Sequence, residues 1–523
     1  MKITHCFQFF ATVVCLLTII SCSQEEVLVF PHTDLTQSPL IPQPTTVSAT
    51  KSAFGLDRLT AITSSVSDDA YTQVAKFLGA QIRSKTAADV ALTFSDETKR
   101  IIQFRQSNSR ELDNDEAYRL DIGTDSIIIT SKTAEGAFRA VQTIEQLIPS
   151  VSNDTITNHS MWLIPTGTIT DSPFFEYRGA MLDVARHFFS VAEVKKYIDA
   201  LTYYKINKLH LHLTDDQGWR IEIKSWPKLT EIGGATEVGG GKGGYYTQED
   251  YKEIVQYAAD RFITIIPEVD MPGHTNAASL AYPILNGNGK KLEAYTGMKV
   301  GFSTFDARKD TVYAFIDDVV REISAITPGP YFHIGGDESH VTPKNDYILF
   351  VSKVEKIVES HGKRMIGWDE ITQSDIGSKS IAQHWHTAEN ATNAVKNGQQ
   401  VIMSPAKKAY LDMKYDTASE YGLNWAAYIP VDTAYIWNPE NYIDGLSKSN
   451  ILGIEAPLWS ETISNSAELE YLAFPRVIGY AEIGWSLPQN RKWEDYKERL
   501  AKQGPYLRSK NINYYETKLV DWE

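Results

Sequence analysis

From about residue 175 onwards, short apolar runs alternate along the chain with longer segments in which apolar residues recur at helical spacing. This alternation is typical of parallel β/α units. Clear helices are expected at Val191–Tyr204, Gln248–Asp260 and Val312–Ala325. Eight apolar runs are candidate strands: Tyr177–Val184, Lys208–Leu213, Phe262–Val269, Tyr331–Ile334, Arg364–Gly367, Ser380–His384, Gln400–Met403 and Leu452–Leu458. Eight such units predict a (β/α)8 barrel.

A doubly wound open sheet is the alternative to a barrel. Such a sheet would more often carry a glycine-rich phosphate turn after its first strand. Asp183-Val184-Ala185-Arg186-His187 stands at that place instead. The expected fold class is therefore α/β, with a (β/α)8 TIM barrel and C-terminal tail over residues 170–510, preceded by a small α/β domain.

The small domain is expected over residues 51–165. Strands are predicted at Ala117–Ile122 and Ser126–Ser131, and a helix from about Thr133 to Leu147. No group of catalytic residue types stands out in this region, so a packing role is expected. Residues 23–50 are rich in Pro, Thr, Ser and Gln, which predicts a linker with no core of its own.

Residues 1–22 have the pattern of an export signal. Lys2 gives a positive start, and the mostly apolar run from Phe7 to Ile20 is short for a bilayer span. The sequence Ile19-Ile20-Ser21-Cys22 resembles a bacterial lipoprotein cleavage box, with Cys22 as the lipidated residue; a plain secretory signal is the alternative. We expect an exported protein, anchored to a membrane in the periplasm or on the outer surface. Its mature chain would lack cysteine for a disulfide or a thiolate site.

Composition narrows the range of partners. A net charge of -15 argues against a nucleic acid, which would require a basic face. The chain has 11 Trp and 27 Tyr, whose flat faces suit ligands with apolar C–H surfaces and a polar rim, such as sugars. Most of these aromatic side chains are nevertheless expected to fill the core.

The residues just past each predicted strand give the main test of function, because barrel active sites are built from these ends. Polar, charged or aromatic residues follow every strand: Arg186; Asp215 and Asp216; Glu268, Asp270 and His274; Asp337 and Glu338; Trp368, Asp369 and Glu370; Trp385 and His386; Tyr410 and Asp412; Trp459 and Glu461. Any one of them alone is more often a helix cap or a packed ring. All eight ends together predict a single pocket.

The stretch Tyr331–His340 is central, because an apolar strand and two glycines lead directly to Asp337 and Glu338. Several carboxylates, three tryptophans and an arginine, without a cysteine or a serine in a nucleophile elbow, fit glycoside hydrolysis. That reaction needs an acid for the leaving oxygen and a group that stabilises positive charge. Neighbours on an extended chain point to opposite sides. We therefore expect Asp337 and Glu338 to be poorly placed as an acid–nucleophile pair across one bond.

Six motifs, in order, resemble the family 20 glycoside hydrolases, the β-N-acetylhexosaminidases. They are MLDVARHFFS (181–190), KLHLHLTDDQGWRIEI (208–223), IPEVDMPGHT (266–275), HIGGDE (333–338), IGWDE (366–370) and LWSE (458–461). The resemblance covers the barrel, and the preceding α/β unit looks like that family's amino-terminal domain.

The resemblance implies a retaining exo-hydrolase that removes terminal β-linked GlcNAc or GalNAc from glycans, without a cofactor or metal. In that family the nucleophile is the substrate's own acetamido carbonyl, which forms an oxazolinium intermediate. Glu338 would be the general acid and base, and Asp337 would orient the acetamido N–H. The matching substrate-site residues are Arg186, Asp215, His274, Trp368, Trp385, Tyr410, Asp412, Trp425, Trp459 and Glu461. Among them, Asp215 and His274 match a pair that tunes the acid.

Two other classes of function remain alternatives. His210-Leu211-His212 is an H-x-H pair on a strand, as in metal-dependent amidohydrolase barrels. The pair lies inside the strand, however, and no further His follows with matching spacing, so packing or supporting histidines are expected. The other alternative is a non-catalytic glycan-binding lipoprotein. The Asp337-Glu338 pair argues against it, because binding alone requires no acid there.

Overall fold

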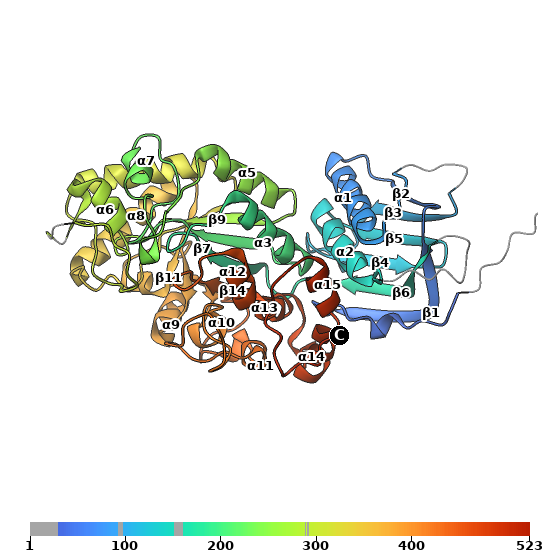
Figure 1. The fold of residues 1–523 in the computed structure, drawn as a ribbon. Coiled ribbons are helices and arrows are strands. Elements are labelled where there is room, and N and C mark those ends of the chain that lie inside the picture. The colour runs from blue at the N-terminus through green and yellow to red at the C-terminus, as the bar shows by residue number, and fades with distance from the viewer. Residues whose placement is uncertain (1–29, 93–97, 151–159, 288, 290–291) are drawn as a thin grey trace, which may run out of the picture.

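The computed structural model describes residues 30–92, 98–150, 160–287, 289 and 292–523. A six-stranded sheet with two helices is followed by a closed eight-stranded barrel (Figure 1). The predicted fold class is therefore confirmed. The predicted signal segment 1–22, with Cys22, lies outside the described residues. None of the helices within the described ranges is both long enough and apolar enough to cross a membrane.

The small domain is a mixed sheet in the strand order β1-β6-β4-β5-β3-β2. Its elements are β1 (Thr46–Leu56), β2 (Thr60–Ser64), α1 (Asp69–Thr86), β3 (Arg100–Gln106), β4 (Tyr118–Ile122), β5 (Ser126–Ser131), α2 (Ala134–Leu147) and β6 (Trp162–Asp171). Figure 1 shows α1 and α2 on the side of the sheet that is turned toward the barrel. The Thr133 hydroxyl accepts a hydrogen bond from the Gly136 N–H and caps the start of α2. The sheet continues beyond the predicted boundary at residue 165.

The predicted linker over residues 23–50 is wrong in its described part. Leu35, Leu40 and Ile41 are buried, and both backbone polar groups of Ile41 bond to the side chain of Gln146. β1 then begins inside the predicted linker and pairs antiparallel with β6. The Pro-, Thr- and Ser-rich composition suggested a solvated tether, but a few apolar residues among the polar ones fix this segment to the core.

The barrel consists of eight parallel strands in the order β7 to β14, and β14 pairs with β7 to close it. The strands are β7 (Tyr177–Asp183), β8 (Lys208–His212), β9 (Thr264–Glu268), β10 (Tyr331–His333), β11 (Arg364–Trp368), β12 (Ile381–His384), β13 (Gln400–Met403) and β14 (Ile451–Leu458). All eight strands predicted from the sequence are present, with small differences at their ends.

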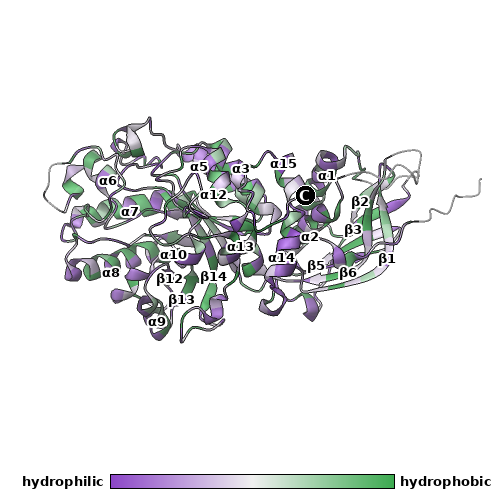
Figure 2. Cartoon of the chain, turned by 60° about the horizontal axis from the view of Figure 1, so that its bottom comes forward, coloured by the Kyte–Doolittle hydropathy of each residue, from purple (hydrophilic) through white to green (hydrophobic). Residues whose placement is uncertain are grey.

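Helices surround the barrel and cover its strands (Figure 1). They are α3 (Val191–Tyr203), α4 (Lys228–Glu231), α5 (Gln248–Ala259), α6 (Asn276–Ala281), α7 (Asp310–Ala325), α8 (Lys344–Ser360), α9 (Ala388–Lys396), α10 (Ala406–Ala409), α11 (Val431–Tyr435), α12 (Ser466–Ala473), α13 (Arg476–Trp485), α14 (Trp493–Ala501) and α15 (Gly504–Ser509). Hydrophilic and hydrophobic residues alternate along α8 in Figure 2, as expected for a helix with one buried face.

The interior of the barrel contains an apolar layer and a polar cluster. The apolar layer comprises Tyr177, Ile266, Tyr331, Ile366, Ile381, Ile402 and Leu452. Five fully buried residues on β8, β9, β10 and β14 form what we call the histidine cluster: His210, His212, Glu268, His333 and Glu455. The predicted pair His210 and His212 therefore lies inside the barrel. Side chains fill the barrel and leave no open pore, as is usual for this architecture.

Buried ion pairs join the two domains. Arg178 on β7 donates to Glu116 of the small domain at 3.0 Å, and Arg139 on α2 donates to the same carboxylate at 2.8 Å. Burial alone would raise the pKa of Glu116, but the two guanidinium charges lower it to about 2. Beside them, Lys205 pairs with Asp171 at 3.2 Å. The pairs Arg178–Glu116 and Lys205–Asp171 thus connect the barrel to the small domain, and breaking either one would leave a buried charge without its partner.

Candidate active site

The turn after β10 sets the position of the two central acids. The backbone is left-handed at Gly335 (φ 67°), Gly336 (φ 97°) and Glu338 (φ 44°). A side chain on Gly335 would come within 1.8 Å of Oδ1 of Asp270, so glycine is required there. The Gly336 N–H donates to the same oxygen at 3.0 Å. The chain is thus not extended, and the expectation that Asp337 and Glu338 diverge is wrong, because both line one cavity.

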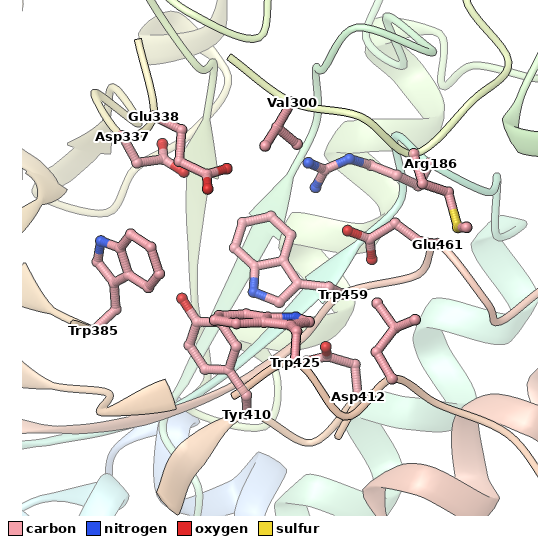
Figure 3. Close-up of a pocket in the computed structure, with 12 residues that line it drawn as sticks. Arg186, Val300, Asp337, Glu338, Trp385, Tyr410, Asp412, Trp425, Trp459 and Glu461 are labelled. Atoms are coloured by element: carbon pink, nitrogen blue, oxygen red, sulfur yellow. The ribbon is translucent and has the colours of Figure 1, made fainter. Parts of the chain in front are cut away.

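This main cavity has a volume of about 480 Å³ and lies at the carboxyl ends of the strands (Figure 3). It brings together most of the site residues predicted from the sequence. Its lining consists of Arg186, Met298, Val300, Asp337, Glu338, Trp385, Tyr410, Asp412, Leu423, Trp425, Trp459 and Glu461. The predicted residues after β7, β10, β12, β13 and β14 converge on this cavity, whereas those after β8, β9 and β11 do not line it.

Figure 3 shows how the polar groups are distributed around the cavity. Asp337 and Glu338 lie on one side, and Arg186 and Glu461 lie on the opposite side, with the ring of Trp459 between them. The guanidinium of Arg186 lies 4.9 Å from the centre of the Trp459 ring. The polar groups therefore surround a flat aromatic floor, which suits a ring with C–H faces and a hydroxylated edge.

Two further aromatic residues wall the cavity, and a third stands at its rim. The rings of Trp385 and Tyr410 are nearly parallel, with centres 6.3 Å apart. The indole N–H of Trp385 donates to the carboxyl group of Glu370 at 3.0 Å. Trp425 is 55% exposed and meets Trp385 edge-on. This large exposed ring at the mouth can contact a ligand that extends out of the cavity.

Three predicted site residues lie behind the wall of the main cavity. Trp368 is almost completely buried, donates its indole N–H to Glu268 at 3.0 Å and supports Trp459 from below, with ring centres 5.6 Å apart. Asp215 and His274 are also buried. These three residues therefore support the cavity without lining it.

Asp215 and His274 connect the interior of the barrel to the two acids. Asp215 accepts from Arg186 at 2.8 Å and from Nδ1 of His274 at 3.2 Å. The other nitrogen of His274 lies 3.7 Å from both Asp337 and Glu338. Burial would lower the pKa of His274, but the charges of Asp215, Asp270 and Asp337 raise it well above its ordinary value. A protonated His274 therefore faces the two acids.

Glu338 has the electrostatics of a proton donor near neutral pH. Burial and the adjacent charge of Asp337 raise the pKa of Glu338 to about 7, against opposing effects of His274 and Arg186. A carboxyl group with such a pKa is about half protonated in neutral solution, so it can both give a proton and accept one back.

Several buried acceptors in the main cavity have no hydrogen-bond partner among the described residues. They are both carboxylate oxygens of Asp412, Oε2 of Glu461 and Oδ1 of Asp337. Burial and the charge of Glu461 raise the pKa of Asp412 well above its ordinary value. Because an unpaired buried polar atom costs free energy, these atoms are suited to a ligand that supplies hydroxyl or amide donors.

A second cavity begins on the other side of Glu338. This outer cavity has a volume of about 640 Å³, shares Glu338, Trp385 and Trp425 with the main cavity, and is also lined by His340 and Lys344. The carboxyl group of Glu338 thus stands at the boundary between the two spaces. A bond that crosses this boundary would have its bridging atom beside the acid.

Sequence reasoning missed some residues of the site. Met298, Val300 and Leu423 line the main cavity but belong to loops without a pattern that would single them out. His333 was also missed as a neighbour of His210, because it lies far away in sequence. The two rings are 4.5 Å apart, since both point into the barrel.

Both ring nitrogens of His212 already contact carboxylates. Nδ1 of His212 contacts Glu268 at 2.6 Å and its Nε2 contacts Asp215 at 3.0 Å. These carboxylates raise the pKa of His212 well above its ordinary value against the effect of burial. A metal ligand needs an unprotonated nitrogen, so the H-x-H pair fits a hydrogen-bonding role better than the metal-dependent alternative.

Comparisons with known proteins agree with this geometry. Residues 175–488 match the catalytic domain of glycosyl hydrolase family 20, and residues 37–172 match domain 2 of the same family. The chain is 39% identical over 411 residues to a beta-N-acetylhexosaminidase of Cellulomonas fimi, which covers 78% of this chain and 82% of that protein.

Solved structures show the same likeness. The family 20 beta-N-acetylhexosaminidase of Streptomyces coelicolor A3(2) has a TM-score of 0.88 and 43% identity, over 94% of this chain and 100% of that one. A mutant beta-hexosaminidase of Streptomyces plicatus in complex with its product GlcNAc also has a TM-score of 0.88 and 43% identity, over 94% of this chain and 99% of that one.

Proposed function

Because the chain belongs to glycosyl hydrolase family 20 and is an exo-β-N-acetylhexosaminidase, we propose that it cleaves terminal β-linked GlcNAc or GalNAc with the substrate's own acetamide as nucleophile. The observation that carries this proposal is the position of Glu338 between the main and outer cavities. The main cavity would hold the terminal sugar, and the outer cavity would hold the leaving group.

In the first step, Glu338 donates its proton to the bridging oxygen as the bond from C1 to that oxygen breaks. The acetamido carbonyl oxygen of the same sugar bonds to C1 and closes an oxazolinium ring. Asp337 would accept a hydrogen bond from the acetamido N–H and stabilise the positive charge, and the Tyr410 hydroxyl would donate to the acetamido oxygen. Asp337 and Tyr410 both line the main cavity.

In the second step, water enters from the side that the leaving group has vacated. The Glu338 carboxylate takes a proton from this water as its oxygen bonds to C1, and the oxazolinium ring opens to restore the acetamide. Two displacements at C1 give a product with retained configuration. The same residue thus serves first as acid and then as base, in accord with its pKa of about 7.

The other residues of the cavity would bind the sugar and tune the acid. Arg186, Asp412 and Glu461 line the main cavity and would hold the outer hydroxyls, which the unpaired oxygens of Asp412 would accept. Trp385 and Trp459 would pack against the ring and the acetamide. Asp215 and His274 would act on Glu338 from behind the wall.

A panel of aryl glycosides tests the mechanism. We expect hydrolysis of the β-GlcNAc and β-GalNAc aryl glycosides, with the plain β-glucoside at least about a hundredfold slower, because the glucoside lacks the nucleophile. NMR spectra recorded early in the reaction should show the β-anomer of the released sugar as the first product. Equal rates on the glucoside and the GlcNAc derivative would overturn substrate assistance.

We also propose that the protein is exported and anchored to a membrane through a lipidated Cys22. The apolar run Phe7–Ile20, the box that ends at Cys22 and the lack of any later cysteine support this proposal. In a bacterial host, the full chain should incorporate labelled fatty acid and appear in the membrane fraction. Cys22→Ser should abolish both signals. Labelling that persists in Cys22→Ser would exclude this anchor.

A further inference from the structure

Glu268, at the end of β9, contacts side chains from three other strands, and two of these strands donate hydrogen bonds to it. Its carboxylate contacts Nδ1 of His212 at 2.6 Å, Nδ1 of His333 at 3.1 Å and the indole N–H of Trp368 at 3.0 Å. Nε2 of His210 lies 2.9 Å away. Glu268 is fully buried, and it does not line the main cavity.

One path leads from Glu268 to the proton donor. His212 contacts Glu268 through one ring nitrogen and Asp215 through the other. Asp215 contacts His274, whose other nitrogen is 3.7 Å from Glu338. Negative and positive groups thus alternate along the path from Glu268 to His274. A change of charge at Glu268 therefore alters the electrostatic potential at His212, Asp215 and His274.

A second path leads from Glu268 to the floor of the main cavity. Its carboxylate fixes the indole of Trp368, and that ring packs against Trp459, which lines the cavity. The buried carboxylate of Glu268 is thus connected both to the proton donor Glu338 and to the floor of the main cavity. Asp412 and Glu461, in contrast, face the cavity directly.

We propose that Glu268 is a positioning residue for the reaction, which orients the Asp215–His274 pair through His212 and the cavity floor through Trp368. This inference rests on the proposed function of Glu338 and extends it to a residue that does not touch the substrate. Similar buried partners of catalytic histidines elsewhere fix the protonation and orientation of the ring.

Electrostatics around Glu268 support this role. Burial would raise the pKa of Glu268, but His212, His333 and His210 hold it well below its ordinary range. Asp183 and Asp215 also act on His212. The charged carboxylate keeps His212 doubly protonated, so that His212 donates in both directions. Without the charge of Glu268, His212 would more readily become neutral. A neutral His212 would carry only one ring N–H for its two neighbours.

Glu455 provides a matched control for Glu268. It is also fully buried and also accepts from His210, at 2.9 Å. Its other donors are Gln383 and Tyr177, and among the described residues its hydrogen bonds do not include His212, Asp215 or Trp368. Glu268→Gln and Glu455→Gln therefore disturb the same cluster, but only Glu268→Gln breaks the two paths.

The experiment measures kcat, KM and the pH profile of both variants on a β-GlcNAc aryl glycoside. We expect Glu268→Gln to lower kcat about tenfold or more and to displace the alkaline limb of kcat/KM by about half a pH unit or more. Glu455→Gln should keep the limb in place. Trp368→Phe, which breaks only the path to the floor, should change kcat or KM without displacing the limb.

Identical profiles for Glu268→Gln and the unmodified enzyme would overturn the inference, as would equal displacement in both glutamine variants. If Glu268→Gln does not fold, His212→Gln breaks the same path one step nearer to Glu338 and carries the same expectation. These results are separate from a failure of the proposed function, which would appear as full activity of the unmodified chain on the plain glucoside.

Discussion

The barrel holds two groups of buried carboxylates that differ in one respect. In the histidine cluster, Glu268 and Glu455 each contact several protein donors. In the main cavity, Asp412 and Glu461 retain oxygens without a partner among the described residues. Asp412 is as fully buried as Glu268 and Glu455, so solvent does not account for the difference at that residue.

The difference separates groups that hold the site from groups that bind its ligand. Burial lowers the stability of an unpaired carboxylate, whereas a carboxylate with several donors is stabilised and fixed in place. The unpaired oxygens are therefore expected to contribute to substrate affinity at some cost to stability. The paired oxygens are expected to contribute to stability and geometry. The predictions below test this contrast.

The largest effect is expected for Glu338→Gln. The amide has no proton to give to the leaving oxygen, so kcat on a natural disaccharide should fall by roughly 10³-fold or more. Affinity for the product GlcNAc, measured by calorimetry, should change little, and the urea midpoint should not fall. Retention of more than a tenth of the activity would show that another group is the acid.

A loss of stability is expected when the histidine cluster is broken. Glu455→Ala leaves the donors of His210, Gln383 and Tyr177 without their acceptor. The free energy of unfolding should fall by about 3 to 5 kcal/mol, as measured by urea denaturation. The enzyme that remains folded should keep the pH profile of the unmodified protein. A loss below about 1 kcal/mol would contradict the distinction between the two groups.

Asp412→Asn in the main cavity is expected to lower activity without lowering stability. The amide replaces one acceptor oxygen of Asp412 with an N–H donor, and a substrate hydroxyl left without its acceptor costs about 1 to 3 kcal/mol, so kcat/KM should fall roughly 10- to 100-fold. The melting temperature should stay the same or rise, because an unpaired buried carboxyl group has been replaced. If Asp412→Asn destabilises the protein as strongly as Glu455→Ala, the comparison fails.

A smaller effect on kcat/KM, which grows gradually as the pH rises, is also expected. The proposed first step requires protonated Glu338, whose pKa is about 7. As pH rises through this value the protonated fraction falls, so kcat/KM should decline above pH 7 and approach a tenfold loss per pH unit. Asp337→Asn removes a charge that raises the pKa of Glu338, so the limb of its residual activity should move to lower pH. A limb that stays in place would show that Asp337 does not act on the acid.

Much of the fold could be predicted because its signals are local. Each barrel strand is a short apolar run, and many of these runs are separated by segments in which apolar residues recur at helical spacing. The convergence of Arg186, Glu338 and Trp459 followed from topology alone, since the carboxyl ends of parallel strands in a barrel meet at one face. The family motifs then supplied the expected roles of these residues.

Features that depend on backbone detail or on distant contacts could not be predicted. The prediction placed Trp368 past the end of its strand, but β11 includes it, so its ring points into the barrel. The left-handed backbone at Glu338 brings that residue to the same side as Asp337. His333 meets His210 only because the barrel closes.

Composition was misleading at the amino-terminal end. A segment rich in proline and threonine suggested a tether, yet Leu35, Leu40 and Ile41 are buried. Average polarity conceals a few well-spaced apolar side chains, and the surface that receives them is formed by residues much later in the chain, such as Gln146.

The ion pairs between the two domains bear on the order of events during synthesis. Domains generally fold as units, and the amino-terminal domain of a chain emerges first. Glu116 is therefore in place when β7 emerges with Arg178. The strand that closes the barrel against β7 is β14, which is translated last of the eight. During this interval, we expect the folded small domain to give the first barrel strand a partner through Glu116 before the other barrel strands are complete.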